Sequence, residues 1–199
     1  VGATLAFLAP YGQLAFMPSL FIRKYDWSPD KLAVAYGAIA VIAGAGGSLA
    51  GGWLVDHWRR RGVSSSPWIL CLGGAFLSLA PAAFAPLAES ATVSLVWFGV
   101  AAIFANWPSI GALAVIADIT PNELRGQITA GHTALIGLVS AGLGPVVVGL
   151  LTDRVFGTDA ALDRSLSVTF AACALMSTLI LTLGYRSYRR ALQTRLDIG

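Results

Sequence analysis

The sequence has 199 residues, of which 56% are hydrophobic and 12% are charged, with a formal net charge of +3 and a mean hydropathy of +0.73. A soluble domain needs a polar surface and carries about 25% charged residues. The composition therefore excludes an ordinary soluble enzyme, and the small, scattered positive charge excludes a nucleic-acid-binding protein. Cys71 and Cys173 lie in apolar runs without metal-ligand spacing, so neither a metal site nor a bound cofactor is predicted. We expect an all-α membrane protein embedded in a lipid bilayer.

Six segments are apolar over the length of about 20 residues that a helix needs to cross a bilayer. They are Gly2–Ile22, Leu32–Leu54, Trp68–Leu87, Ala91–Ala117, Ile128–Leu151 and Leu166–Tyr185. The first segment has neither the basic start nor the cleavage-like end of a signal peptide. Because the chain begins at Val1 directly in an apolar segment, we expect it to be a fragment of a longer membrane protein.

The basic residues predict the orientation, because they favour the cytoplasmic side of a membrane. Six spans place both termini on the same side as the second and fourth connections. That side carries 8 of the 13 basic residues, namely Arg59, Arg60, Arg61, Arg125, Arg186, Arg189, Arg190 and Arg195. We therefore expect cytoplasmic termini and a multi-pass protein of a bacterial inner membrane.

Two of the segments begin and end alike. Ser28-Pro29 precedes the second and Thr120-Pro121 precedes the fifth, which is the pattern of a polar N-cap followed by proline. Glu123 stands three residues after Thr120 and predicts a capping box. The ends also correspond, since Gly52–Asp56 (GWLVD) matches Gly149–Asp153 (GLLTD).

These matches predict two three-helix repeats, residues 1–88 and 90–187, followed by a cytoplasmic tail at residues 188–199. An odd number of spans gives the repeats opposite orientations, as in secondary transporters. Twelve of the 22 glycines lie on the middle helices of the two repeats. Small residues allow close helix packing in lipid, so we expect these two helices to slide against a partner.

The segment Gly52–Arg61 (GWLVDHWRRR) resembles the signature loop of the major facilitator superfamily, Gly-x-Leu-Ala-Asp-Arg-x-Gly-Arg-Arg. His57 stands at a basic position of that loop and Arg59 replaces its glycine. The family shows this degenerate form in its C-terminal half. The resemblance therefore implies the second half of a transporter.

A second set of residues carries the same resemblance. Thr120–Gly126 (TPNELRG) is similar to the Pro-Glu-x-x-Arg-Gly opening of the family's eleventh helix. Gly142–Pro145 with Gly149–Asp153 is similar to the end of that helix in spinster-like and related organic-solute branches. The resemblance spans about residues 28–153 and implies a partner, the N-terminal six-helix half of the same protein.

The resemblance also implies a charge cluster that closes a cytoplasmic gate. Its members are Asp56, Arg59, Arg60, Glu123 and Arg125. A carboxylate at the C-terminal end of a helix needs a cation nearby, and the arginines on this side can supply one. The alternative role of the arginines is to keep this end of the helices on the cytoplasmic side of the membrane by their positive charge.

Polar side chains next to prolines mark the middle of the first and fourth segments, Pro10–Gln13 and Asn106–Ser109. Proline frees backbone carbonyls, and polar groups at that depth do not face lipid. We expect the substrate cavity to be lined by Tyr11, Gln13, Asn106 and Trp107. Interhelical hydrogen bonding for the two amides, and core packing for the two aromatic rings, are the alternatives.

His132 is the one ionisable residue at depth, which makes it a candidate proton relay; a neutral histidine bonded to a carbonyl or water is the alternative. The sequence predicts half of a secondary transporter, not an enzyme, that moves a small organic or amphiphilic solute by alternating access. Two other hypotheses are a free-standing half-size transporter acting as a dimer and a rhomboid-like intramembrane protease using Ser48 and His132.

Overall fold

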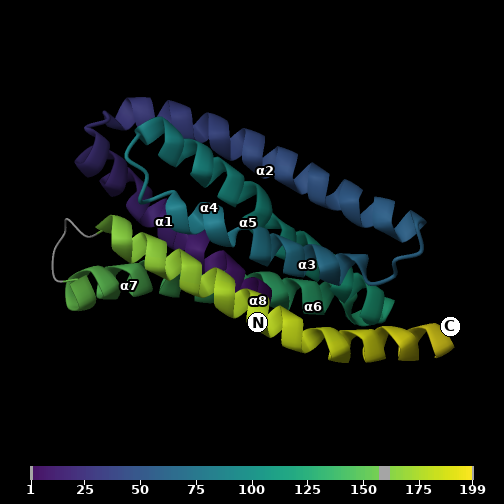
Figure 1. The fold of residues 1–199 in the computed structure, drawn as a ribbon. Coiled ribbons are helices and arrows are strands. Elements are labelled where there is room, and N and C mark those ends of the chain that lie inside the picture. Colours follow the sequence, from purple (N-terminus) through teal and green to yellow (C-terminus); the bar gives the residue numbers. More distant parts are fainter. Residues whose placement is uncertain (1, 157–161, 199) are drawn as a thin grey trace.

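The computed structural model describes residues 2–156 and 162–198, and these residues form a bundle of helices (Figure 1). The elements are α1 (Gly2–Tyr25), α2 (Pro29–Arg60), α3 (Ser66–Leu77), α4 (Leu79–Phe84), α5 (Ala91–Ile119), α6 (Asn122–Leu135), the π-helix η1 (Ile136–Ser140), α7 (Ala141–Leu150), the π-helix η2 (Leu151–Phe156) and α8 (Leu162–Ile198). With α3–α4 and α6–α7 each counted as one span, the described residues contain six helices that are long and apolar enough to cross a membrane. The six predicted spans are confirmed.

α1 and α5 lie between the other helices of the bundle (Figure 1). α5 packs mainly against α2 and α3, whereas α1 packs mainly against α7 and α8. The first helix of each predicted repeat thus packs on the second and third helices of the other repeat. In terms of the predicted repeats, the packing is therefore reciprocal.

Two glycines on the middle helices allow close approaches within this packing. A Cβ atom at Gly47 of α2 would lie 2.9 Å from Cα of Ile103 in α5. A Cβ atom at Gly144 of α7 would lie 2.8 Å from the carbonyl oxygen of Leu8 in α1. Both positions require glycine because the neighbouring atoms belong to a backbone that cannot swing aside. Each glycine lies on the middle helix of its repeat and packs on the first helix of the other.

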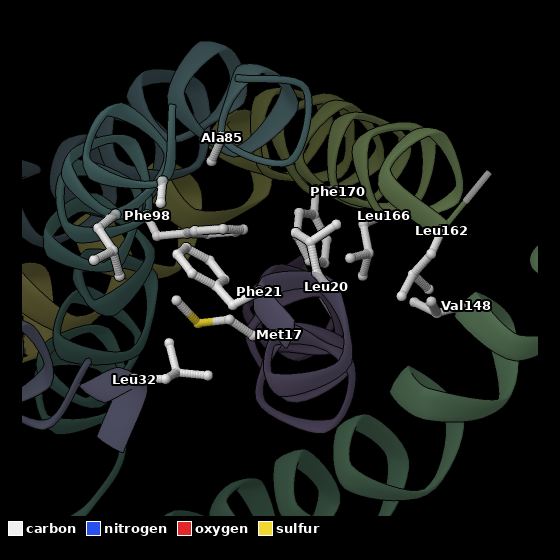
Figure 2. Close-up of a cluster of buried hydrophobic side chains, with 12 residues drawn as sticks. Met17, Leu20, Phe21, Leu32, Ala85, Phe98, Val148, Leu162, Leu166 and Phe170 are labelled. Carbon is white, nitrogen blue, oxygen red and sulfur yellow. The ribbon is translucent and has the colours of Figure 1, made fainter. Parts of the chain in front are cut away.

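A cluster of buried apolar side chains fills the bundle near the end of α1 (Figure 2). Phe21 of α1 lies against Phe98 of α5, with ring centroids 6.3 Å apart, while Leu166 and Phe170 of α8 pack beside Leu20. Lipid is itself apolar, so such a cluster stabilises a membrane protein through close packing more than through exclusion of water. The cluster joins α1, α5 and α8.

Polar contacts close the same end of the bundle. Lys24 Nζ lies 3.1 Å from Oδ2 of Asp163 and donates a 2.7 Å hydrogen bond to the carbonyl of Pro86. The Tyr25 hydroxyl donates a 2.6 Å hydrogen bond to the carbonyl of Ala88. The end of α1, the connection before α5 and the start of α8 are thereby held together.

The ends of α2 are set by local sequence. Ser28 is the N-cap, and its hydroxyl accepts a 3.4 Å hydrogen bond from the Lys31 N–H, which confirms that predicted start. At the other end, the Gly62 N–H donates to the Arg59 carbonyl and the Val63 N–H to the Trp58 carbonyl. Gly62 has a φ of +83°, which a glycine adopts without strain. This Schellman motif ends α2 and turns the chain toward α3.

The structure differs from two local expectations. The expected capping box of Thr120 and Glu123 does not form, because Thr120 is the buried C-cap of α5 and its N–H bonds the Ile116 carbonyl. Pro121 takes the N-cap position of α6 instead. The expected tail at residues 188–199 is not a separate segment either, since α8 continues as one helix to Ile198.

Candidate functional site

A cavity of about 110 Å³ lies among α1, α5 and α8. Gln13 and Asn106 both line it, together with Tyr36 of α2 and Ser78 between α3 and α4. The space exists because half of the 14 lining residues are alanines: Ala6, Ala9, Ala82, Ala101, Ala102, Ala105 and Ala174. The two amides come from the middle of the first helix of each predicted repeat.

The amides of the cavity keep hydrogen-bonding capacity. Asn106 Nδ2 donates a 2.8 Å hydrogen bond to the Ala102 carbonyl, which leaves its second amide hydrogen and its oxygen. The amide nitrogen of Gln13 contacts the sulfur of Met17, a weak acceptor, at 3.9 Å. Both side chains can therefore donate to and accept from a neutral polar group.

Prolines add acceptors near the same place. A proline inside a helix removes the N–H that would bond the carbonyl four residues earlier. Pro10 therefore leaves the Ala6 carbonyl without its helical donor, and both residues line the cavity. Pro108 in α5 does the same to the Phe104 carbonyl.

The other two predicted cavity residues lie elsewhere. Trp107 is turned toward α2, where its indole N–H donates a 3.1 Å hydrogen bond to the Gly47 carbonyl. Cβ of Tyr11 lies 3.2 Å from the position that a Cβ on Gly144 would occupy. The base of the Tyr11 side chain is therefore next to α7. Neither residue lines the cavity that holds Gln13 and Asn106.

The predicted gate residues lie at the end of the bundle where α2 and α5 finish. Arg59 Nη2 lies 2.7 Å from Oδ2 and 2.8 Å from Oδ1 of Asp118. Sequence reasoning missed Asp118, although it is the single acidic residue of α5 and lies on the arginine-bearing side. The pair joins α2 to α5.

Arg125 binds the same end of α5 in another way, because its guanidinium donates a 2.8 Å hydrogen bond to the Ala117 carbonyl. A cation at the last carbonyls of a helix is favourable. Asp56, Arg60 and Glu123 are exposed, and none of the three has an ion pair within the described part of the chain. The structure thus connects Arg59 and Arg125 through α5, not through Asp56.

His132 lies on α6, about one helical turn before the π-helix η1. Its Nε2 atom is buried and has no hydrogen-bond partner among the residues that the structure describes. Neither a relay partner nor the alternative carbonyl bond is therefore present at this nitrogen. No hydrogen bond joins Ser48 to His132 within residues 2–156 and 162–198, and the same ranges hold no group of metal ligands.

Six helices long and apolar enough to span a membrane, packed around a mostly apolar, uncharged cavity that holds two amide side chains, define a transporter-type fold. The chain belongs to the Major Facilitator Superfamily, whose family profile matches residues 1–196. The predicted family is therefore confirmed.

Solved structures show the same fold. The chain is similar to a bacterial homolog of the human lysosomal transporter Spinster in an inward-facing and occupied conformation, with a TM-score of 0.70 and 20% identity. It also resembles that homolog in an inward-facing and unoccupied conformation, with a TM-score of 0.64 and 20% identity. Both matches cover 98% of this chain and 47–48% of the other, so the chain spans about half of these transporters. No curated protein matches the chain.

Proposed function

We propose that the chain forms the C-terminal six-helix half of a secondary transporter that moves a small organic or amphiphilic solute by alternating access. The observation that carries the proposal is the cavity that holds Gln13 and Asn106 at mid-length of α1 and α5. Broken or proline-containing first helices around a midplane site are typical of secondary transporters. Family membership supports a carrier in place of an enzyme.

The size and chemistry of the cavity restrict the solute. About 110 Å³ is well below the roughly 300–1,000 Å³ of a typical ligand site, so the solute has to extend beyond this half. The lining residues carry no formal charge at neutral pH. Because an isolated ion is costly to desolvate at this depth, we assign hydrogen bonding and packing to this half and any charge recognition to the other.

The exposed apolar faces support a second six-helix half as the partner. Three spans are the least buried within the described chain: α2, α5 and the α6–α7 helix. The partner is assigned to the faces of α2 and of α6–α7. Their large exposed apolar side chains include Val34, Val41, Ile42, Leu49 and Trp53 on α2 and Leu135, Leu138, Leu143, Val146 and Leu150 on the other helix. Eight of the twelve glycines on these helices have open space where a Cβ would lie. Such surfaces suit a partner that moves against them.

The charge cluster is assigned to the cytoplasmic gate. In this proposal Arg59–Asp118 and Arg125 hold α2 and α6 to the end of α5, while Asp56, Arg60 and Glu123 face the other half. The excess of basic residues on this side supports cytoplasmic termini in a bacterial inner membrane. His132 remains a candidate proton relay only if it gains a partner from the other half.

The test is uptake into vesicles that contain the intact protein to which this chain belongs. A panel of labelled neutral and amphiphilic organic solutes is offered, and Asn106→Ala and Gln13→Ala are compared with Thr182→Ala, an exposed position on α8. Weaker uptake in the two cavity variants alone supports the proposal. Equal uptake in all three, or assembly of two copies of this half without a second half, contradicts it.

A further inference from the structure

A second cavity lies far from the solute site, at the end of the bundle that carries the arginines. It is a cleft of about 390 Å³ between the connection Gly62–Ser65 and the last part of α8. The α8 residues that line it include Tyr185, Arg189 and Gln193. Its volume falls within the range of small-molecule binding sites. The cleft is therefore large enough for a polar ligand of several atoms.

The walls of the cleft are polar and held in place. The connection is fixed by the Schellman motif at Gly62, and the hydroxyls of Ser65 and Tyr185 lie 3.5 Å apart across the cleft. The guanidinium carbon of Arg189 lies 6.0 Å from the centre of the Tyr185 ring, and Arg189 lines the same cleft. Hydroxyl, amide and guanidinium donors thus converge on one space.

The charge around the cleft is strongly positive. Arg59 is neutralised by Asp118, but five other arginines at this end form no ion pair within the residues that the structure describes. They are Arg60 and Arg61 at the end of α2 and Arg186, Arg189 and Arg190 on α8. A cluster of unpaired cations attracts an anion with several oxygen acceptors, and guanidinium groups match the geometry of phosphate.

The position along α8 puts the cleft at the membrane surface. At 1.5 Å per residue, the predicted span Leu166–Tyr185 covers the roughly 30 Å hydrocarbon layer. Arg189 lies about 6 Å beyond Tyr185 along the helix, which is the depth of the lipid headgroups. Leu183 and Leu179 of α8 are 79% and 61% exposed, and the 100° turn per residue places Leu183 on another face of the helix from Tyr185 and Arg189. Their exposure is consistent with contact between this part of α8 and the hydrocarbon layer.

We propose that this cleft binds the phosphate headgroup of an anionic phospholipid. Basic pockets between membrane helices on the cytoplasmic side are suited to such headgroups. The site lies on α3 and α8, away from the faces of α2 and α6–α7 that we assign to the other half of the transporter. A lipid bound there bridges the α2–α3 connection to α8.

The experiment is native mass spectrometry of the intact protein released from nanodiscs that contain equal amounts of dioleoyl-phosphatidylglycerol and dioleoyl-phosphatidylcholine. We expect selective retention of phosphatidylglycerol, weakened about fivefold in Arg189→Gln. The matched control is Arg164→Gln, which removes an exposed cation from the opposite end of the same helix. Ser64→Glu, which places a negative charge in the cleft, weakens retention further.

Two results overturn the proposal. One is equal retention of the two lipids in the wild-type protein, or equal losses in Arg189→Gln and Arg164→Gln. The other is complete displacement of phosphatidylglycerol by an excess of inorganic phosphate, because the ligand would then be a free anion and not a lipid. Thermal unfolding of each variant checks that the lost retention is not caused by misfolding.

Discussion

Arg59 places one guanidinium nitrogen 2.7 and 2.8 Å from the two carboxylate oxygens of Asp118, and thereby joins the end of α2 to the end of α5. The two helices belong to different predicted repeats. The Arg59 side chain is 40% exposed and that of Asp118 is 20% exposed, so the pair contributes at most about 1 kcal/mol to stability. Its role is to fix the relative position of two helix ends.

We expect Asp118→Asn to slow solute uptake by the intact transporter while lowering its unfolding free energy by less than about 1 kcal/mol. Asparagine keeps the size of the side chain but removes the charge that holds Arg59. The control is Asp30→Asn, an exposed carboxylate in the first turn of α2 at the other end of that helix. An exchange of the two charges, Arg59→Asp with Asp118→Arg, restores part of the uptake. Unchanged uptake in Asp118→Asn contradicts a gating role.

Asp56 gives a different expectation because it has no ion pair within the described chain. If its partner is in the other half, Asp56→Asn slows transport without changing the folding or membrane insertion of the protein. Uptake rates together with the amount of protein in the membrane measure the two effects. Transport equal to that of the wild type would reduce Asp56 to an anchoring residue.

The close glycine contacts predict a difference between neighbouring positions on one helix. Gly47→Ala places a methyl group 2.9 Å from the Ile103 backbone and costs about 1–3 kcal/mol, because α2 and α5 must separate. Gly44→Ala meets nothing within 4 Å in the described chain and gains helix propensity, so it costs less stability than Gly47→Ala. Thermal unfolding of the intact protein measures both. A lower melting temperature in Gly44→Ala than in Gly47→Ala contradicts this packing.

Features that depend on nearby residues alone were predictable from the sequence. Hydropathy located all six spans because each helix must be apolar over the thickness of the bilayer. Ser28 was correctly predicted as an N-cap because capping involves only the next three residues. Gln13 and Asn106 were both placed near a midplane cavity from their depth and their neighbouring prolines, and the structure brings them to one cavity.

Features that depend on how helices rotate against one another were not predictable. Trp107 is one residue from Asn106, yet the 100° turn between them directs its indole to the Gly47 carbonyl on α2. Asp118 has no motif of its own, and only the meeting of α2 and α5 gives it Arg59 as a partner. Tyr36 and Ser78 complete the cavity from helices whose rotation the sequence did not reveal.

The last prediction concerns solute binding and coupling. Gln13 and Asn106 offer hydrogen bonds without charge, so Gln13→Ala and Asn106→Ala raise the apparent KM for uptake and leave its pH dependence unchanged. His132 lies on α6 and outside the lining of the cavity, so His132→Ala leaves the KM unchanged. Uptake measured over a range of solute concentrations and pH values separates the two effects. If His132→Ala alone abolishes the pH dependence, proton coupling resides in this half, and the assignment of charge recognition to the other half is wrong.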